Sequence, residues 1–285
     1  MNVDHFITIG SSHNAQGKPC EDYALSGKLP SGAVFGVVSD GCSGANANTD
    51  VGSRALSWAF QQVLEHRTAQ VGEWFADGFT NELKRVFGNL QYPTSARSDY
   101  LATVVGFAAT PEQASIFVHG DGAVAFRFAD GSMRLIEFNW WDNTPFYLNY
   151  QLHHDLLDQF VKPYESGLIE PFGMRTTTFR PTADGIEVLD SVHERFSMDE
   201  LFDGYVLSVR PTDDGIVAIA VLTDGVEQVG AKPALEVAAE FLAYKNHEGE
   251  FVKRRMLRAL KDFRKDGLNP RDDVGIAAVW FSEKV

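Results

Sequence analysis

The chain has few cysteines and a shortage of basic residues, and each deficit excludes a class of protein. Two cysteines among 285 residues, Cys20 and Cys42, cannot build a disulfide framework, and with no export signal we interpret both as reduced thiols. The 25 Lys and Arg are outnumbered by 39 Asp and Glu, which gives a formal net charge of -14. Because nucleic acids and anionic membranes bind basic surfaces, we expect neither as a partner.

Long apolar segments are also missing. No stretch approaches the ~20 continuous apolar residues that cross a bilayer. The opening residues, MNVDHFITIGSSHN, lack the basic region and apolar core of an export signal. We therefore expect a cytoplasmic protein. An apolar fraction of 44% is sufficient for a sizeable core, so the chain is expected to fold.

Strands and helices are predicted in blocks, which favours an α+β layered fold over a doubly wound one. Short strands fill the first 41 residues, and helical periodicity follows between Asp50 and His66. A second helix is predicted over 73–90. The strands YLATVVGFAAT, QASIFVHG, AVAFRFAD and SMRLIEF then predict an antiparallel meander, and the chain closes with strands GYVLSV and IVAIAVLTDG, helices over 234–245 and 250–265, and strand VGIAAVWF.

Residues 139–211 show only fragments of either period and are rich in aromatic, proline and polar residues. We interpret this region as an insertion or as a flap over a site. The sequence shows no internal repeat, low-complexity linker or domain boundary, so we expect a single domain over 1–285.

Acids recur where apolar strands end or in tight turns beside them. An Asp-Gly pair alone is ordinary turn chemistry, but strands of one sheet core can bring such ends together. Clustered carboxylates repel one another unless a cation neutralises them, and oxygen ligands favour Mg²⁺ or Mn²⁺ over zinc. The acids are Glu21 and Asp22 in KPCEDY, Asp40 in VVSDG, Asp121 in VHGDGA, Asp224 in VLTDG, and Asp272 and Asp273 in NPRDDVG.

The order of these motifs, ED, DG, GD, TDG and DD, resembles that of the metal-dependent protein phosphatases of type 2C. The resemblance runs from GSSHNAQGKPCEDY to RDDVGIAAVWF, nearly the whole chain, and the SH...GKPCED opening is most similar to a bacterial branch. It implies a four-layer αββα fold, a β-sandwich of two antiparallel sheets flanked by α-helices. It also implies a centre of two Mg²⁺ or Mn²⁺ ions between the sheet ends.

Carried over residue by residue, the resemblance implies a role for each acid. Asp224 and the last acid match ligands of the second ion. The last acid is Asp272 if the DD pair aligns directly with the family pattern, and Asp273 if the alignment shifts by one residue. The matches are Asp22 and Asp40 as ligands of the two ions, with Asp40 as the bridge, Gly41 as a ligand through its carbonyl, Asp224 and Asp272 as ligands of the second ion, and Glu21 as an acid that holds water at the centre.

The sequence also departs from the family pattern. Many members carry an arginine that grips the substrate phosphate four residues before the ED pair, where this chain has Gly17. His13 or Lys18 are our candidates for binding the phosphate instead. Cys42 stands where some relatives have a histidine acid, which leaves protonation of the leaving group to water. Gln228 replaces an acid of a third metal site, so a third ion is only weakly supported.

The resemblance implies a serine/threonine protein phosphatase that uses a metal-activated water on phosphorylated proteins, with a cognate kinase as its natural counterpart. Two alternatives stay open. One is a catalytically weak or inactive module that binds a phosphorylated partner, and the other is an unrelated two-metal hydrolase of nucleotides or small phosphoesters.

Overall fold

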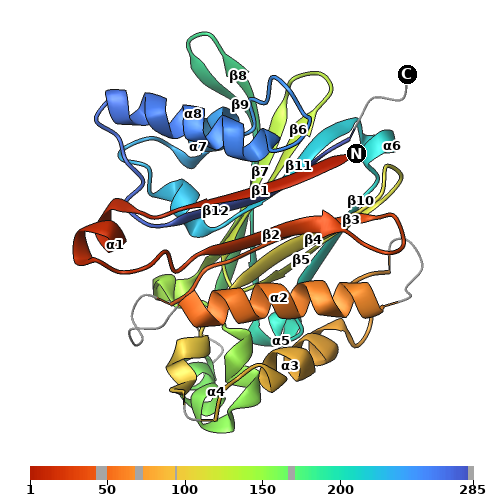
Figure 1. Cartoon of the computed structure of the whole chain (residues 1–285), viewed down its shortest axis with the longest axis vertical. Helices are drawn as coiled ribbons and strands as arrows, with labels where there is room; N and C mark the ends of the chain where they lie inside the picture. Colours follow the sequence, from red (N-terminus) through yellow and green to blue (C-terminus); the bar gives the residue numbers. More distant parts are fainter. Residues whose placement is uncertain (43–49, 68–72, 94, 166–170, 282–285) are drawn as a thin grey trace.

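Two antiparallel sheets stack face to face, with helices on both outer faces (Figure 1). The computed structural model describes residues 1–42, 50–67, 73–93, 95–165 and 171–281. Helices α7 and α8 cover one sheet, and α2 and α3 cover the other. The predicted αββα sandwich of α+β class is therefore confirmed.

The larger sheet has seven strands in the order β1-β12-β11-β6-β7-β8-β9, and the smaller has five in the order β10-β5-β4-β3-β2. Every pairing is antiparallel. The strands are β1 (Asn2–Thr8), β2 (Tyr23–Lys28), β3 (Val34–Ser39), β4 (Val104–Ala109), β5 (Ala114–His119), β6 (Gly122–Phe128), β7 (Met133–Trp140), β8 (Phe172–Thr182), β9 (Gly185–Phe196), β10 (Tyr205–Val209), β11 (Ile216–Leu222) and β12 (Val274–Trp280).

Helices pack through apolar stripes at helical spacing. In α2 the stripe includes Leu56, Ala59, Phe60 and Val63, all buried. The helix predicted over 73–90 begins later than expected because residues up to Gly78 are not helical. The helices are α1 (Ser11–Gln16), α2 (Asp50–His66), α3 (Phe79–Asn89), α4 (His154–Val161), α5 (Met198–Leu201), α6 (Pro211–Asp214), α7 (Ala234–Phe241) and α8 (Phe251–Lys265), with short 3-10 turns at Arg97–Tyr100, Trp141–Asn143, Leu148–Leu152, Lys162–Tyr164 and Asp224–Glu227.

Some predicted strands are apolar at almost every position. In the structure these strands are buried on both faces. On β3, Val38 packs between the sheets, whereas Phe35 and Val37 face the helices on the outside. On β11, Val221 packs between the sheets and Leu222 packs toward α7 and α8. A strand with helices on one side and a second sheet on the other cannot alternate apolar with polar residues, which explains the unbroken runs.

The prediction that four consecutive strands form one antiparallel meander is wrong, because the strands are divided between the two sheets. Strands β4 and β5 belong to the five-stranded sheet, whereas β6 and β7 belong to the seven-stranded one. The chain changes sheets at Gly120 and Gly122, whose φ angles of 103° and 130° other residues rarely adopt. Asp121 therefore lies where the chain passes from one sheet to the other.

The region 139–211 contributes to both sheets. Strands β8 and β9 extend the seven-stranded sheet, and β10 forms an edge of the other. The sequence concealed β9 because most of its side chains are exposed on both faces. Among its described residues, 141–165 carry only α4 and short 3-10 turns. No helix in the described ranges has the length and apolarity needed to cross a membrane.

Close packing of β4 against α2 gives a test of this architecture. A Cβ on Gly106 would lie 2.4 Å from Cζ of Phe60, so we expect Gly106→Ala to lower the free energy of unfolding by about 1–3 kcal/mol. A Cβ on Gly88 in α3 would meet only Leu152 methyls at 3.6 and 3.7 Å, so Gly88→Ala should be neutral or stabilising by up to about 1 kcal/mol. Urea denaturation measures both, and equal effects would contradict this packing.

Candidate metal centre

The acids singled out in the sequence are delivered to one end of the sandwich by different strands. Asp22 immediately precedes β2 and Asp40 follows β3, both in the five-stranded sheet. Asp121 lies between β5 and β6, Asp224 follows β11 after one residue, and Asp272 comes two residues before β12. The charges of these groups act on one another, so the side chains share one region.

Mutual repulsion is strong at this end. Burial raises the pKa of the Asp22 and Asp40 carboxyls well above the usual range, and the charge of Asp224 adds to both shifts. Burial also raises the pKa of Asp121, and the charge of Asp224 raises it further. Burial and then the charge of Asp272 raise the pKa of Asp224 to about 6. Carboxyls in this state either keep a proton or need a cation.

Thr223 connects the two sheets at the centre. Its hydroxyl donates to Oδ2 of Asp22 over 2.6 Å and accepts from the backbone N–H of Gly275 over 2.8 Å. The carboxylate of Asp22 is thereby fixed against the ends of β11 and β12. Sequence reasoning missed this residue, although a hydroxyl directly before the acid in VLTDG was the available signal.

The two adjacent acids near the end of the chain have different environments. Asp273 is 2% exposed and its two oxygens accept the backbone N–H groups of Gly10 and Glu21, each over 2.6 Å. The Asp272 side chain is 33% exposed, and Nε2 of Gln228 lies 3.3 Å from its Oδ2. The oxygens of Asp272 are bonded as well, Oδ1 to the backbone N–H of Asp273 over 2.9 Å and Oδ2 to Gln228, but the Asp272 side chain is far more exposed than that of Asp273. We therefore favour Asp272 as the ligand.

Glycines permit these loops to touch. A Cβ on Gly10 would lie 2.2 Å from the carbonyl carbon of Asp272, and one on Gly225 would lie 1.8 Å from the carbonyl oxygen of Asp273. No larger residue fits at either position without moving the backbone. The glycine that follows Asp224 therefore has a packing role in addition to its role in the turn.

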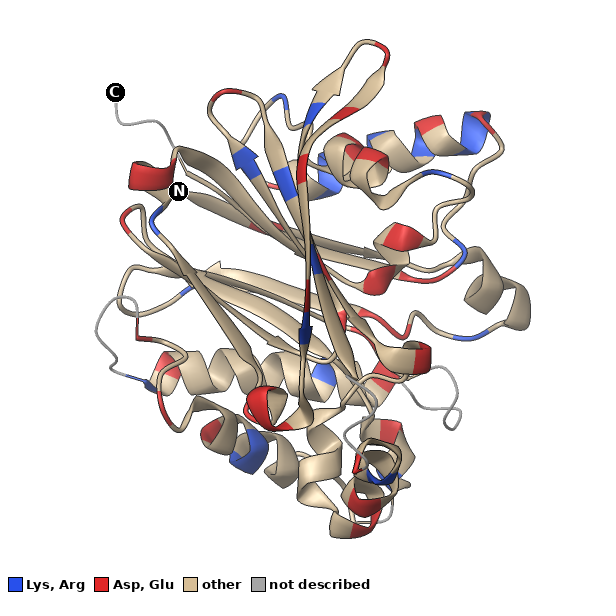
Figure 2. Ribbon diagram, turned by 180° about the vertical axis from the view of Figure 1, so that it is seen from behind, with Lys and Arg blue, Asp and Glu red and all other residues tan. Residues whose placement is uncertain are grey.

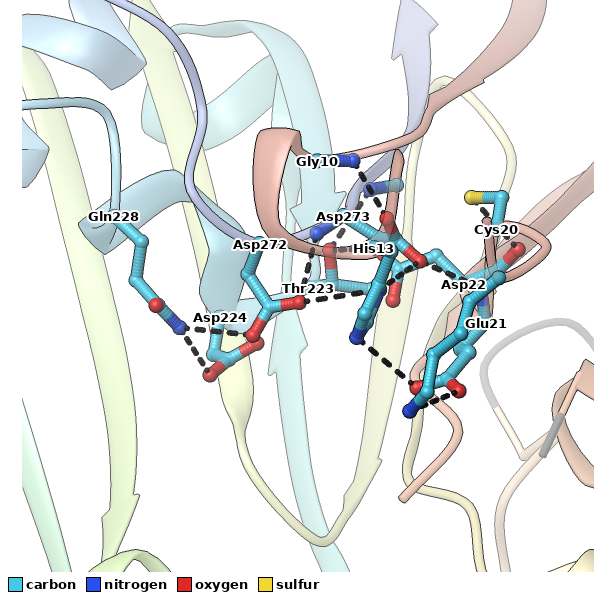
Figure 3. Close-up of polar contacts among 12 residues, drawn as sticks. Gly10, His13, Cys20, Glu21, Asp22, Thr223, Asp224, Gln228, Asp272 and Asp273 are labelled. Atoms are coloured by element: carbon cyan, nitrogen blue, oxygen red, sulfur yellow. Dashed lines mark hydrogen bonds and ion pairs between the residues drawn. The ribbon is translucent and has the colours of Figure 1, made fainter. Parts of the chain in front are cut away.

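His13 lies inside the centre and not on its rim (Figure 3). Its Nε2 is 3.3 Å from Oε2 of Glu21, and its Nδ1 is 3.0 Å from Oδ2 of Asp273 and 3.7 Å from Oδ1 of Asp272. Helix α1, which the sequence analysis did not predict, turns the imidazole inward and buries it. Both ring nitrogens thus face carboxylates.

The two predicted phosphate-binding residues both contact Glu21. Nζ of Lys18 lies 3.3 Å from Oε1 of Glu21, whose side chain is 2% exposed. A phosphate role for Lys18 or His13 stays a prediction, and it requires that these contacts be exchanged for contacts with substrate. Gly17, at the position of the missing arginine, has a φ of 68°, a left-handed conformation that disfavours arginine.

The donor set of the centre fits hard divalent cations. Oδ1 of Asp121 is buried with no hydrogen-bond partner in the described part of the chain, and Oε2 of Glu21 has only the 3.3 Å contact with Nε2 of His13. One ligand atom each from His13, Asp272 and Asp273 also lie within 4.8 Å of one another. Since Asp273 is buried and holds the backbone of Gly10 and Glu21, we favour the set of Asp22, Asp40, Asp224 and Asp272, all oxygen donors suited to Mg²⁺ or Mn²⁺.

A tyrosine from the strand-free segment 141–165 also borders the centre. Burial raises the pKa of Tyr147, and the charges of Cys42, Asp121 and Asp40 add to the shift. The phenol therefore stays neutral at physiological pH and offers a hydroxyl near two of the acids. Nothing in the aromatic run FNWWDNTPFYLNY distinguished this residue from its neighbours.

The fold is similar to those of solved bacterial phosphatases. A bacterial serine phosphatase shares 15% identity and a TM-score of 0.59, with 100% of each chain covered. The Staphylococcus aureus serine/threonine phosphatase Stp1 shares 13% identity and a TM-score of 0.56, with 99% of this chain and 96% of that chain covered. At such identities the likeness shows the fold alone.

The sequence identifies the family more directly. A family model described as Protein phosphatase 2C matches residues 9–265. The chain belongs to the protein phosphatase 2C family, which confirms the family predicted from the motifs. No curated protein matches the sequence.

Metal removal gives a test of the acid cluster. Asp22, Asp40, Asp121 and Asp224 have pKa values raised above those of the unfolded chain, so their contribution favours folding at low pH and is lost as pH rises through the folded values. For Asp224 that window lies between about 4 and 6. With EDTA, we expect Tm to fall between pH 5 and pH 7.5.

Mg²⁺ or Mn²⁺ should restore Tm at pH 7.5, because a cation removes the repulsion without requiring protons. Differential scanning fluorimetry at both pH values, with and without metal, measures the effect. A Tm independent of metal at pH 7.5 would argue against the predicted centre.

The contacts of His13 give a second test. In His13→Gln the carboxylates of Glu21 and Asp273 lose the imidazole between them, so we expect lower stability. Asp273→Asn removes one of those charges, so it should cost less in the His13→Gln background than in the wild type. We expect a coupling of about 0.5–3 kcal/mol in a double-mutant cycle measured by urea denaturation. Additive effects would show that His13 and Asp273 act independently.

Proposed function

We propose that this protein is a serine/threonine protein phosphatase that hydrolyses phosphoester bonds with water and depends on two Mg²⁺ or Mn²⁺ ions. The observation that carries the proposal is the convergence of Asp22, Asp40, Asp224 and Asp272 from separate strands, where burial and then the charges of neighbouring acids raise the pKa values of Asp22, Asp40 and Asp224. Membership of the phosphatase 2C family supports the reaction class. A cognate kinase is the natural counterpart of such an activity.

Each residue of the centre has a defined task in this proposal. The carboxylates of Asp22 and Asp40 would hold the two ions, together with the carbonyl of Gly41. Asp224 and Asp272 would be further ligands of the second ion. When bound, the ions supply a readily ionised water and positive charge against the phosphate. Thr223 orients the Asp22 carboxylate by donating to Oδ2, which leaves Oδ1 for a ligand role.

Cys20 is poorly suited to act as a nucleophile. Burial raises the pKa of the Cys20 thiol, and the charges of Asp22 and Asp273 raise it further, so this cysteine is protonated at neutral pH. Direct attack by water on phosphorus needs no covalent intermediate. Glu21, whose Oε2 has only the 3.3 Å contact with Nε2 of His13, could accept a hydrogen bond from a water at the centre.

A second candidate function is a module that binds a phosphorylated partner without turnover. It is favoured by Gly17 at the position of the missing arginine and by the pairing of Lys18 and His13 with Glu21. These features leave the substrate phosphate with fewer cationic side chains than the family pattern provides. The two functions differ in turnover, not in the ability to bind a phosphopeptide.

Hydrolysis of a small phosphoester and of a phosphoserine peptide with Mn²⁺ tests the proposal. We expect Asp40→Asn to lower kcat/KM by about 100-fold or more. Loss of a residue that only supports a metal ligand already costs about 10–100-fold, and Asp40 is itself a predicted ligand. Asp262→Asn, an exposed acid on α8, is the matched control and should leave activity unchanged. Phosphopeptide binding without turnover by the wild type would instead establish the binding module.

A further inference from the structure

Helix α8 concentrates positive charge in an otherwise acidic protein. Its 15 residues carry seven of the 25 Lys and Arg and only one of the 39 acids. The apolar face of the helix is buried against the seven-stranded sheet and α7, and basic positions recur along its ribbon (Figure 2). Exposure to solvent accounts for a basic face on this helix. It does not account for the four cations that surround a single cavity.

A cavity of about 210 Å³ lies between the N-terminal half of α8 and residues 243–246. Its lining includes Lys245, Arg254, Arg255 and Arg258 and no acidic residue. Sites for drug-sized ligands measure about 300–1,000 Å³, so this cavity suits a smaller group. None of its residues belongs to the acid centre.

Two of the arginines are held in place by carbonyl groups. Arg254 donates to the carbonyl oxygen of Glu248 over 2.6 Å. Arg255 donates to the main-chain carbonyl and to the carboxylate of Glu240, and its side chain is 12% exposed. Glu240 offsets part of the charge of Arg255. A guanidinium has five N–H donors, so these contacts fix both groups without using every donor.

The other two cations lack such partners. Lys245 and Arg258 are exposed, and among the described residues neither has a carboxylate within 4.0 Å, although the charge of Arg258 acts on Asp262 one turn further along the helix. Arg254 and Arg258 stand four residues apart on α8, a spacing at which like charges repel. Tyr244 also lines the cavity, and its buried hydroxyl has no hydrogen-bond partner among the described residues. An anion between these groups would relieve the repulsion and accept their free donors.

We propose that this cavity binds a phosphate dianion, either free or carried by a phosphorylated side chain. Guanidinium groups bind phosphate oxygens through paired N–H donors, and four cations around a small cavity exceed what a single negative charge requires. The site is separate from the metal centre and does not rest on the proposed catalytic function.

Isothermal titration calorimetry of the full chain with inorganic phosphate tests the site. Prior treatment with EDTA removes metal from the acid centre, so that phosphate cannot bind there through ions. We expect one phosphate per chain for the wild type. The double variant Lys245→Ala/Arg258→Ala should weaken binding about tenfold or more, as expected for loss of charge-assisted hydrogen bonds. A phosphoserine peptide in a second arm shows which source of phosphate binds better.

The matched control is Lys261→Ala/Arg264→Ala, which removes the same charge from positions of α8 outside the cavity. It should keep the affinity within about twofold, because general attraction to a basic helix is screened at physiological salt. Equal losses in both double variants would overturn the proposal by showing diffuse attraction. Absence of binding by the wild type to both probes would overturn it as well. Circular dichroism confirms that each variant is folded.

Discussion

Repulsion among buried carboxylates is the constraint on which this structure depends. Asp22, Asp40, Asp121 and Asp224 come from both sheets and raise one another's pKa values in addition to the effect of burial. A folded chain gains nothing in stability from such a cluster, which must keep protons or bind cations. The sandwich therefore carries, at one end, an arrangement that favours function over the stability of the metal-free chain.

The surrounding structure counteracts this repulsion with directed contacts. Thr223 fixes Asp22, backbone N–H groups satisfy Asp273, and His13 lies between Glu21 and Asp273. The apolar layers on both faces of each sheet supply the bulk of the stabilisation and hold the strand ends together. The acids are thus positioned by a rigid core and oriented by a few polar neighbours.

The sequence predicted the layered fold and the acids at the strand ends. It did not predict which side chains contact one another. The unbroken apolar runs and the acids at their ends were visible in the sequence, and the family followed from their order. The division of the meander between two sheets could not be predicted, because the sequences of β5 and β6 are similarly apolar. Only the turn at Gly120 and Gly122 directs the chain into the other sheet. The environment of His13 could not be predicted either, since it depends on residues more than 250 positions away.

That separation has a consequence for how the protein is made. Gly10 and Glu21 donate to Asp273 across 263 and 252 residues of chain, and Ser11 and Ser12 bond to the carbonyls of Pro270 and Arg271. During synthesis the donors of residues 10–21 stay in water until residues 270–273 have left the ribosome. The nascent chain can thus hold most of its layers while it still lacks a completed centre, so that centre assembles only after residues 270–273 have been made.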